Sequence, residues 1–157
     1  MSDGLLVQVD DADIQALLDN TLAALENPEP LLRTIGETIR VNVAGRLASN
    51  TDPTGAPWAP LAEATLARKK GRGSTLVDSG DMRRSLTYNL GSDYVEIGFG
   101  EPYAQYHETG TERMPRRGLL LADIGFSDDG DVSASLGEGD RQDILDDVFA
   151  YLRSAGL

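Results

Sequence analysis

Ser85-Leu-Thr-Tyr-Asn-Leu-Gly-Ser-Asp-Tyr-Val-Glu-Ile-Gly-Phe99 is the stretch that decides the fold. Apolar and polar residues alternate on both sides of a Gly91-Ser92-Asp93 turn. Such alternation is typical of strands with one buried face, so the segment predicts an antiparallel hairpin over 85–99. The residues expected on the buried face are Leu86, Tyr88, Leu90, Val95, Ile97 and Phe99.

Helical periodicity replaces this alternation on either side of the hairpin. Asp10 or Asp11 is expected to cap a first helix that ends near Glu26, and Asn27 to cap a second that ends near Ser49. The first helix carries one apolar stripe, made of Ile14, Leu17, Leu18, Leu22 and Leu25. Shorter helices are expected at 61–70, 81–84 and 103–108. Asp140 is expected to cap the last helix.

The last helix is expected to turn its apolar residues inward. These residues are Ile144, Leu145, Val148, Phe149 and Leu152. The patterns together predict an α+β fold, in which N- and C-terminal helices pack on a small antiparallel β-sheet with long ordered loops.

At 157 residues the chain is expected to form a single domain, 1–157. Its parts are a helical region (10–49), a central region (50–122), an acidic glycine-rich stretch (123–139) and a C-terminal helix (140–156). Leu119–Ala122 is a candidate strand, and Asp129-Gly130 is the expected turn of a second hairpin between Phe126 and Val132.

A proline-rich loop opens the central region. Residues 50–60 hold three prolines and a glycine, which excludes a helix or a central strand. The only tryptophan, Trp58, lies in this loop. We interpret it as the structural anchor of the loop to the core; a ligand contact is the alternative.

Charge is strongly negative and unevenly distributed. The net charge is −12, with −7 over residues 1–30, +2 over 31–117 and −7 over 118–157. This balance argues against a protein whose whole surface binds nucleic acid. The chain has no cysteine and no apolar run near the ~20 residues that span a bilayer. Its first residues lack the pattern of a signal peptide, so we expect a cytoplasmic protein without membrane attachment.

Residues suited to catalysis are few. His107-Glu108 is half of a zinc-binding His-Glu-x-x-His helix, but Gly110 and Thr111 follow and the second histidine is missing. We therefore expect no enzyme, no metal and no cofactor. The alternative is a small metal-dependent or DNA-processing enzyme with a pocket formed by His107, Asp78 and Asp81.

Two basic clusters are the candidate interface. They consist of Arg68, Lys69, Lys70 and Arg72, and of Arg113, Arg116 and Arg117. The first could contact DNA phosphate or be a solvated helix end. The second would suit an acidic surface, which a second copy of this chain offers. Reversal of Arg116 and Arg117 to Glu is then expected to impair assembly and to leave the monomer folded.

Several segments occur in an order that resembles a known family. The segments are Asp52-Pro-Thr-Gly-Ala-Pro-Trp-Ala-Pro-Leu61, Thr65-Leu-Ala-Arg-Lys-Lys70, Leu76-Val-Asp-Ser-Gly-Asp-Met82, Arg84-Ser-Leu86, Val95-Glu-Ile-Gly98 and Tyr103-Ala-Gln-Tyr-His-Glu-Thr-Gly110. Over about 32–122 and the final helix, the chain resembles the tailed-phage virion morphogenesis family, whose members are also called tail completion proteins. It departs from that family at Arg116-Arg117-Gly118, where an arginine-proline-phenylalanine step is usual, and 123–139 resembles an insertion.

The resemblance implies a structural protein of the virion that completes the tail or joins it to the head. It implies a ring of copies, expected to be a hexamer, in the neck region between connector and tail tube proteins. DNA would pass through the channel of that ring without specific binding. The protein would occupy the head–tail junction in the virion and the host cytoplasm during assembly.

Overall fold

The computed structural model describes residues 12–130 and 132–156, with side chains described from residue 15 onward. The expected caps Asp10 and Asp11 lie outside this range. The helices are α1 (Ala12–Glu26), α2 (Glu29–Ser49), α3 (Glu63–Lys69), α4 (Asp81–Arg84), α5 (Ala104–Thr109) and α6 (Glu138–Ser154). The strands are β1 (Leu86–Leu90), β2 (Val95–Phe99), β3 (Asp123–Phe126) and β4 (Val132–Ser135). The α+β class is confirmed.

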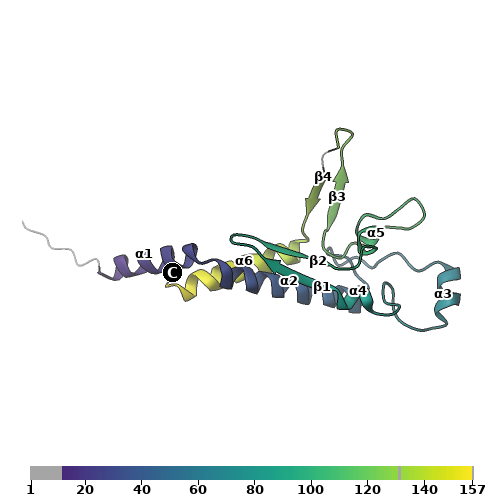
Figure 1. The fold of residues 1–157 in the computed structure, drawn as a ribbon, viewed down its shortest axis with the longest axis horizontal. Coiled ribbons are helices and arrows are strands. Elements are labelled where there is room, and N and C mark those ends of the chain that lie inside the picture. Colours follow the sequence, from purple (N-terminus) through teal and green to yellow (C-terminus); the bar gives the residue numbers. More distant parts are fainter. Residues whose placement is uncertain (1–11, 131, 157) are drawn as a thin grey trace, which may run out of the picture.

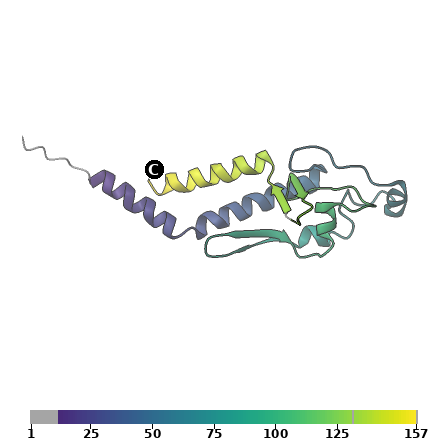
Figure 2. The ribbon, with the colours of Figure 1, turned by 90° about the horizontal axis from the view of Figure 1, so that it is seen from above.

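Helix α2 is the centre of the body. The β1–β2 hairpin lies along one side of α2, and α6 lies along the other (Figure 2). Gly36 allows the hairpin to approach closely, because a Cβ atom there would lie only 2.6 Å from the ring of Tyr88. The sheet therefore packs mainly on α2, and α6 packs on α2 instead of on the sheet.

The predicted hairpin is confirmed, including its faces. β1 and β2 pair antiparallel, with Leu86 opposite Phe99 and Leu90 opposite Val95. The alternate residues Leu86, Tyr88 and Leu90 are the less exposed ones of β1. The core that α2 and the hairpin share with neighbouring loops consists of Ile39, Val43, Leu47, Trp58, Met82, Ala104 and Leu119.

Helix α6 faces the body with a mixture of acidic and apolar residues, which corrects part of one prediction. The carboxylates of Asp140, Asp143 and Asp147 all bond to α2: Asp140 to Arg46, Asp143 to Asn42 and Asp147 to Thr38. Asp140 is a buried residue within the helix, and Gly137 holds the N-cap position. Leu145 and Phe149 are exposed. Ile144 packs against the core, and Val148 and Leu152 are partly buried. The expected inward face is therefore correct for these three residues and wrong for Leu145 and Phe149.

A second hairpin projects from the body at the position predicted for the Asp129-Gly130 turn (Figure 1). β3 and β4 pair antiparallel with Phe126 opposite Val132. The expected strand at Leu119–Ala122 is wrong. The backbone N–H groups of Leu119, Leu120 and Leu121 bond to the carboxylate of Glu108 and not to a neighbouring strand.

The molecule is elongated, and its two ends differ. Helix α1 extends at one end and α3 lies at the other (Figure 1). α1 touches the body through Tyr151, whose hydroxyl donates to the carbonyl oxygens of Ala24 and Asn27 at 3.1 and 2.7 Å. In the described part of the chain, no helix has the length and apolar character needed to cross a membrane.

The proline-rich loop is held from within and from the core. One carboxylate oxygen of Asp52 accepts the N–H groups of Thr54 and Ala56 at 2.8 and 3.0 Å. Trp58 is only 8 % exposed, and its indole N–H donates to the carbonyl oxygen of Gly118 at 3.0 Å. The loop is thereby attached to the segment that follows α5.

Trp58→Ala is expected to lower the free energy of unfolding by about 3 kcal/mol or more, because a large buried ring is removed. Trp58→Phe is the matched control. It keeps most of the apolar volume and leaves the carbonyl of Gly118 without its donor, so a smaller loss of about 1–3 kcal/mol is expected. Urea titration measures both, and equal stability of the alanine variant and wild type would contradict the burial.

Candidate functional site

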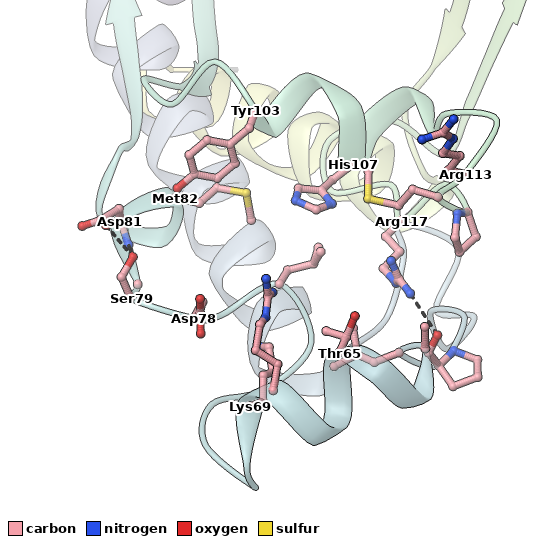
Figure 3. Close-up of a pocket in the computed structure, with 18 residues that line it drawn as sticks. Thr65, Lys69, Asp78, Ser79, Asp81, Met82, Tyr103, His107, Arg113 and Arg117 are labelled. Carbon is pink, nitrogen blue, oxygen red and sulfur yellow. Dashed lines mark hydrogen bonds between the residues drawn. The ribbon is translucent and has the colours of Figure 1, made fainter.

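A cavity of about 650 Å³ opens at the α3 end of the molecule (Figure 3). Its lining comes from α3 and the segment before it, from α4 and the loop that leads to it, and from α5 and the loop that follows. The apolar part of the lining consists of Pro60, Leu61, Leu76, Met82, Met114 and Pro115. The size is within the range of sites that accept a large ligand group.

Lys69 shapes one wall of the cavity. Its ammonium group donates to the carbonyl oxygens of Ser74 and Val77, each at 2.7 Å. These two bonds hold the glycine-containing loop after α3 against the helix. The sequence placed Lys69 in a basic cluster, and the structure shows that its charge is used within the chain.

The other cations of the α3 end are differently placed. Arg68 and Arg113 line the cavity, while Lys70 and Arg72 are exposed beside it. Within residues 12–130 and 132–156, none of these four forms an ion pair. They form an unneutralised basic rim, named here the α3 rim.

Arg116 and Arg117 differ from this rim, because both serve the chain's own fold. Arg117 is 5 % exposed and donates to the carbonyl oxygens of Ala59 and Pro60, each at 3.0 Å. Arg116 donates to the carbonyl of Leu121 at 2.5 Å and to further main-chain oxygens. These contacts argue against a folded monomer after both charges are reversed, because the main-chain acceptors would lose their donors.

His107 projects from α5 into the cavity (Figure 3). Its Nδ1 atom is buried and has no hydrogen-bond partner among the described residues. Burial, and then the positive charge of Arg117, lower the pKa of His107 below its ordinary value. The imidazole is thus neutral near pH 7 and adds no charge to the basic lining.

Asp78 and Asp81 line the same cavity, as the enzyme alternative required. Asp81, however, bonds to Arg84 and to the hydroxyl of Ser79. No hydrogen bond joins His107 to either aspartate within the described residues. No group of metal-binding side chains occurs in that part of the chain either. The arrangement therefore lacks a hydrogen-bonded pair of the kind used in acid–base catalysis.

We expect the free energy of unfolding to fall as the pH drops below about 6.5. The unfolded chain takes up a proton on histidine near that pH, whereas the folded chain resists it because the pKa of His107 is lowered. His107 is the only histidine, so His107→Gln should flatten the pH dependence between about pH 5 and 7. Urea unfolding at several pH values provides the measurement, and identical slopes in both proteins would disprove the assignment.

Two helices expose apolar faces that no other described residue covers. On α1, Leu18, Leu22 and Leu25 are 52 %, 57 % and 63 % exposed. On α6, Leu145 and Phe149 are exposed on the side away from α2. Apolar stripes of this kind on folded helices mark sites of interaction with other molecules.

Comparison with known proteins identifies the family of the chain. The model of the phage virion morphogenesis family matches residues 9–153. The chain belongs to this family. It is 27 % identical over 142 residues to the Mu-like prophage FluMu G protein 2 of Haemophilus influenzae, an alignment that covers 90 % of both chains.

A second relative is the putative capsid assembly protein G of Escherichia phage Mu. Identity to it is 30 % over 115 residues, which is 70 % of this chain and 73 % of the relative. No solved structure matches the chain. Membership in the virion morphogenesis family supports a structural or assembly role in a phage, and neither relative is named as an enzyme.

The residues that form the cavity were only partly visible in the sequence. The basic clusters and His107 were identified, but Met82, Leu76 and Met114 were not. Each of the three lies in a loop or a single helical turn, outside any long periodic segment. Hydrophobic periodicity makes no prediction at such positions. The only hint of burial was that these apolar residues lie among glycines and prolines.

Proposed function

We propose that this chain is a structural virion protein of a tailed phage or prophage, which completes the tail or joins it to the head as a ring in the neck region. The observation that carries the proposal is the family match over residues 9–153. The proposed location is the head–tail junction of the virion, with the host cytoplasm as the site of assembly.

The surface of the chain supports a role in assembly. Apolar residues of α1 and α6 are exposed, and the cations of the α3 rim have no partner within the described residues. Such surfaces gain stability when other subunits cover them. The proposed partners are further copies of this chain, expected to form a hexameric ring, and the connector, neck and tail tube proteins of the same particle.

The net charge of the chain supports a channel through which DNA passes without being bound. The chain carries −12 overall, so a ring of copies would present much more acidic than basic surface. Acidic side chains repel phosphate and release no counterions from it. A channel lined in this way would let DNA pass without specific binding.

Deletion of the gene from the phage that encodes it tests this role. We expect the mutant to produce full heads and tails that do not form joined, infectious particles. Supply of the wild-type protein from a plasmid should restore joined particles. Electron microscopy of lysates and a plaque count are the measurements.

Antibody labelling of purified wild-type particles shows where in the particle the protein lies. We expect an antibody against the chain to mark the neck. Joined, infectious particles from the deletion mutant, or label confined to the capsid or the tail tip, would overturn the proposal.

A further inference from the structure

The three exposed leucines of α1 have the spacing of a helix that binds in a groove. Leu18, Leu22 and Leu25 stand at positions i, i+4 and i+7, which places them on one side of the helix. Helices that dock into apolar grooves present anchors at this spacing. α1 contacts its own body through other residues, since Leu17 lies near Gly156 and Ala24 near Tyr151. The leucine face therefore remains available to a partner.

The α3-end cavity has the matching character. Leu61, Leu76, Met82 and Met114 give it an apolar lining. Its volume of about 650 Å³ is open to the exterior of the chain and holds no side chain of α1. Three leucine side chains require an apolar recess, and this cavity is large enough to accept them.

Charge is complementary between the two surfaces. Helix α1 itself contains no base and three acids, Asp13, Asp19 and Glu26. The α3 rim contributes Arg68 and Arg113 to the cavity lining, and both lack an ion-pair partner within the described residues. The acids of the lining are Asp78 and Asp81, and Asp81 is paired with Arg84. An acidic helix and a basic rim attract each other and help to fix the register of docking.

Distance prevents α1 from reaching the cavity of its own chain. α1 and α3 lie at opposite ends of the long axis (Figure 1). Helix α2, which separates them, has 21 residues and is therefore about 31 Å long. A contact between the leucine face and the cavity must then join two copies of the chain.

We propose that α1 of one copy docks its leucine face into the α3-end cavity of a second copy, so that copies associate head to tail. This contact uses two different surfaces, and repetition of it yields a closed ring when the rotation between copies closes. The inference rests on the proposed function, because it names the partner surfaces from which the ring would be built. The α6 stripe is the competing receptor for α1, but it is an exposed helix face and not a recess of the kind found at the α3 end.

Cysteine cross-linking tests the contact, and the absence of native cysteine gives a clean background. Leu22→Cys marks the helix, and Thr65→Cys marks the cavity wall on α3. We expect a covalent dimer when the two single variants are mixed under mild oxidation. Thr87→Cys, an exposed threonine on β1, is the matched control and should give no dimer with Leu22→Cys.

Two results of this experiment would overturn the inference. The first is a dimer that forms as readily from Leu22→Cys alone, or from Leu22→Cys mixed with Phe149→Cys, as from the proposed pair. The second is the absence of any Leu22–Thr65 dimer in a preparation that light scattering shows to be oligomeric. Either result would place α1 elsewhere than in the cavity.

A second set of variants separates this inference from the proposed function. The triple variant Leu18→Gln, Leu22→Gln and Leu25→Gln changes exposed residues only, so its circular dichroism spectrum should match that of wild type. We expect light scattering to show wild type as an oligomer and the triple variant as a monomer. Val41→Gln, an equally exposed apolar residue of α2, should remain oligomeric. High salt should weaken association of the wild type.

The outcomes are distinguishable. If the triple variant assembles as well as wild type, the docking site is wrong, while the role in the phage neck stands. If the deletion mutant yields joined particles, the proposed function fails whatever the cross-linking shows.

Discussion

Arg46→Ala is expected to lower the free energy of unfolding by about 3–5 kcal/mol. Arg46 of α2 and Asp140 of α6 are both buried and form an ion pair. The same guanidinium donates to the carbonyl oxygen of Leu119 at 2.8 Å, and Asp140 also accepts from Asn42 at 3.0 Å. Removal of the arginine leaves a buried carboxylate without its counter-charge. Chemical denaturation followed by circular dichroism measures the loss.

Two controls assign this loss to the unpaired charge. Arg33→Ala removes an exposed arginine that pairs with Glu29 at 2.7 Å, and it should leave the free energy of unfolding almost unchanged, because solvent screens the pair. The double variant Arg46→Met, Asp140→Leu replaces the pair with apolar side chains and should recover much of the stability lost in Arg46→Ala. A double variant as unstable as the single one would show that packing, and not charge, determines the cost.

The ion pair is an example of a contact that the sequence alone does not predict. Periodicity located α2 and α6, because each carries apolar residues at helical spacing. It could not join Arg46 to Asp140, which are 94 positions apart. Nothing local distinguishes an aspartate that caps a helix from one that binds a distant arginine. Asp140 was therefore predicted as a cap and proved to be a buried partner.

The hairpin was predictable for the opposite reason. Its partners are close in sequence, so alternation and the turn at Gly91-Ser92-Asp93 determine the pairing locally. Apolar stripes on helices are less decisive, because they show which face is apolar and not whether the chain covers it. Leu145 and Phe149 were expected inside for this reason. Their exposure makes them candidates for contacts with other subunits. The periodicity of one chain cannot predict such contacts.

The candidate site contains some features that the sequence predicts and others that it does not. The clusters around Arg68 and Arg113 were visible as charge, and the structure places them at one cavity. The sequence did not show which of these cations form hydrogen bonds within the chain and which do not. Arg116 and Arg117 are neighbours of Arg113 in sequence, yet they bond to main-chain oxygens of the fold. Only the three-dimensional path of the segments after α5 and before α3 makes those oxygens available.

Glu108→Ala is expected to lower the free energy of unfolding by about 3 kcal/mol or more, because one carboxylate organises a whole segment. One oxygen of Glu108 accepts the N–H groups of Leu119 and Leu120 at 2.9 and 3.0 Å. The other accepts the N–H of Leu121 at 2.9 Å and faces Arg116 at 3.3 Å. Removal of the carboxylate leaves three main-chain donors unpaired beside the buried side chain of Leu119.

Amide hydrogen exchange identifies the mechanism directly. We expect the amides of Leu119, Leu120 and Leu121 to exchange faster in Glu108→Ala, since their acceptor is gone. Glu108→Gln keeps one acceptor oxygen and should be intermediate in both exchange and stability. Glu112→Ala, at an exposed position in the following loop, should match wild type. Unchanged exchange at these three amides in Glu108→Ala would contradict the role of the carboxylate.

The same variant links the fold to the proposed docking site. Met114 and Arg117, which line the cavity, belong to the segment between Glu108 and the three amides. Loss of the carboxylate should loosen that wall, so Glu108→Ala is expected to weaken self-association even below the denaturant concentration at which it unfolds. Light scattering of the folded variant provides the measurement. An oligomer as stable as that of wild type would show that this wall does not contribute to the contact between copies.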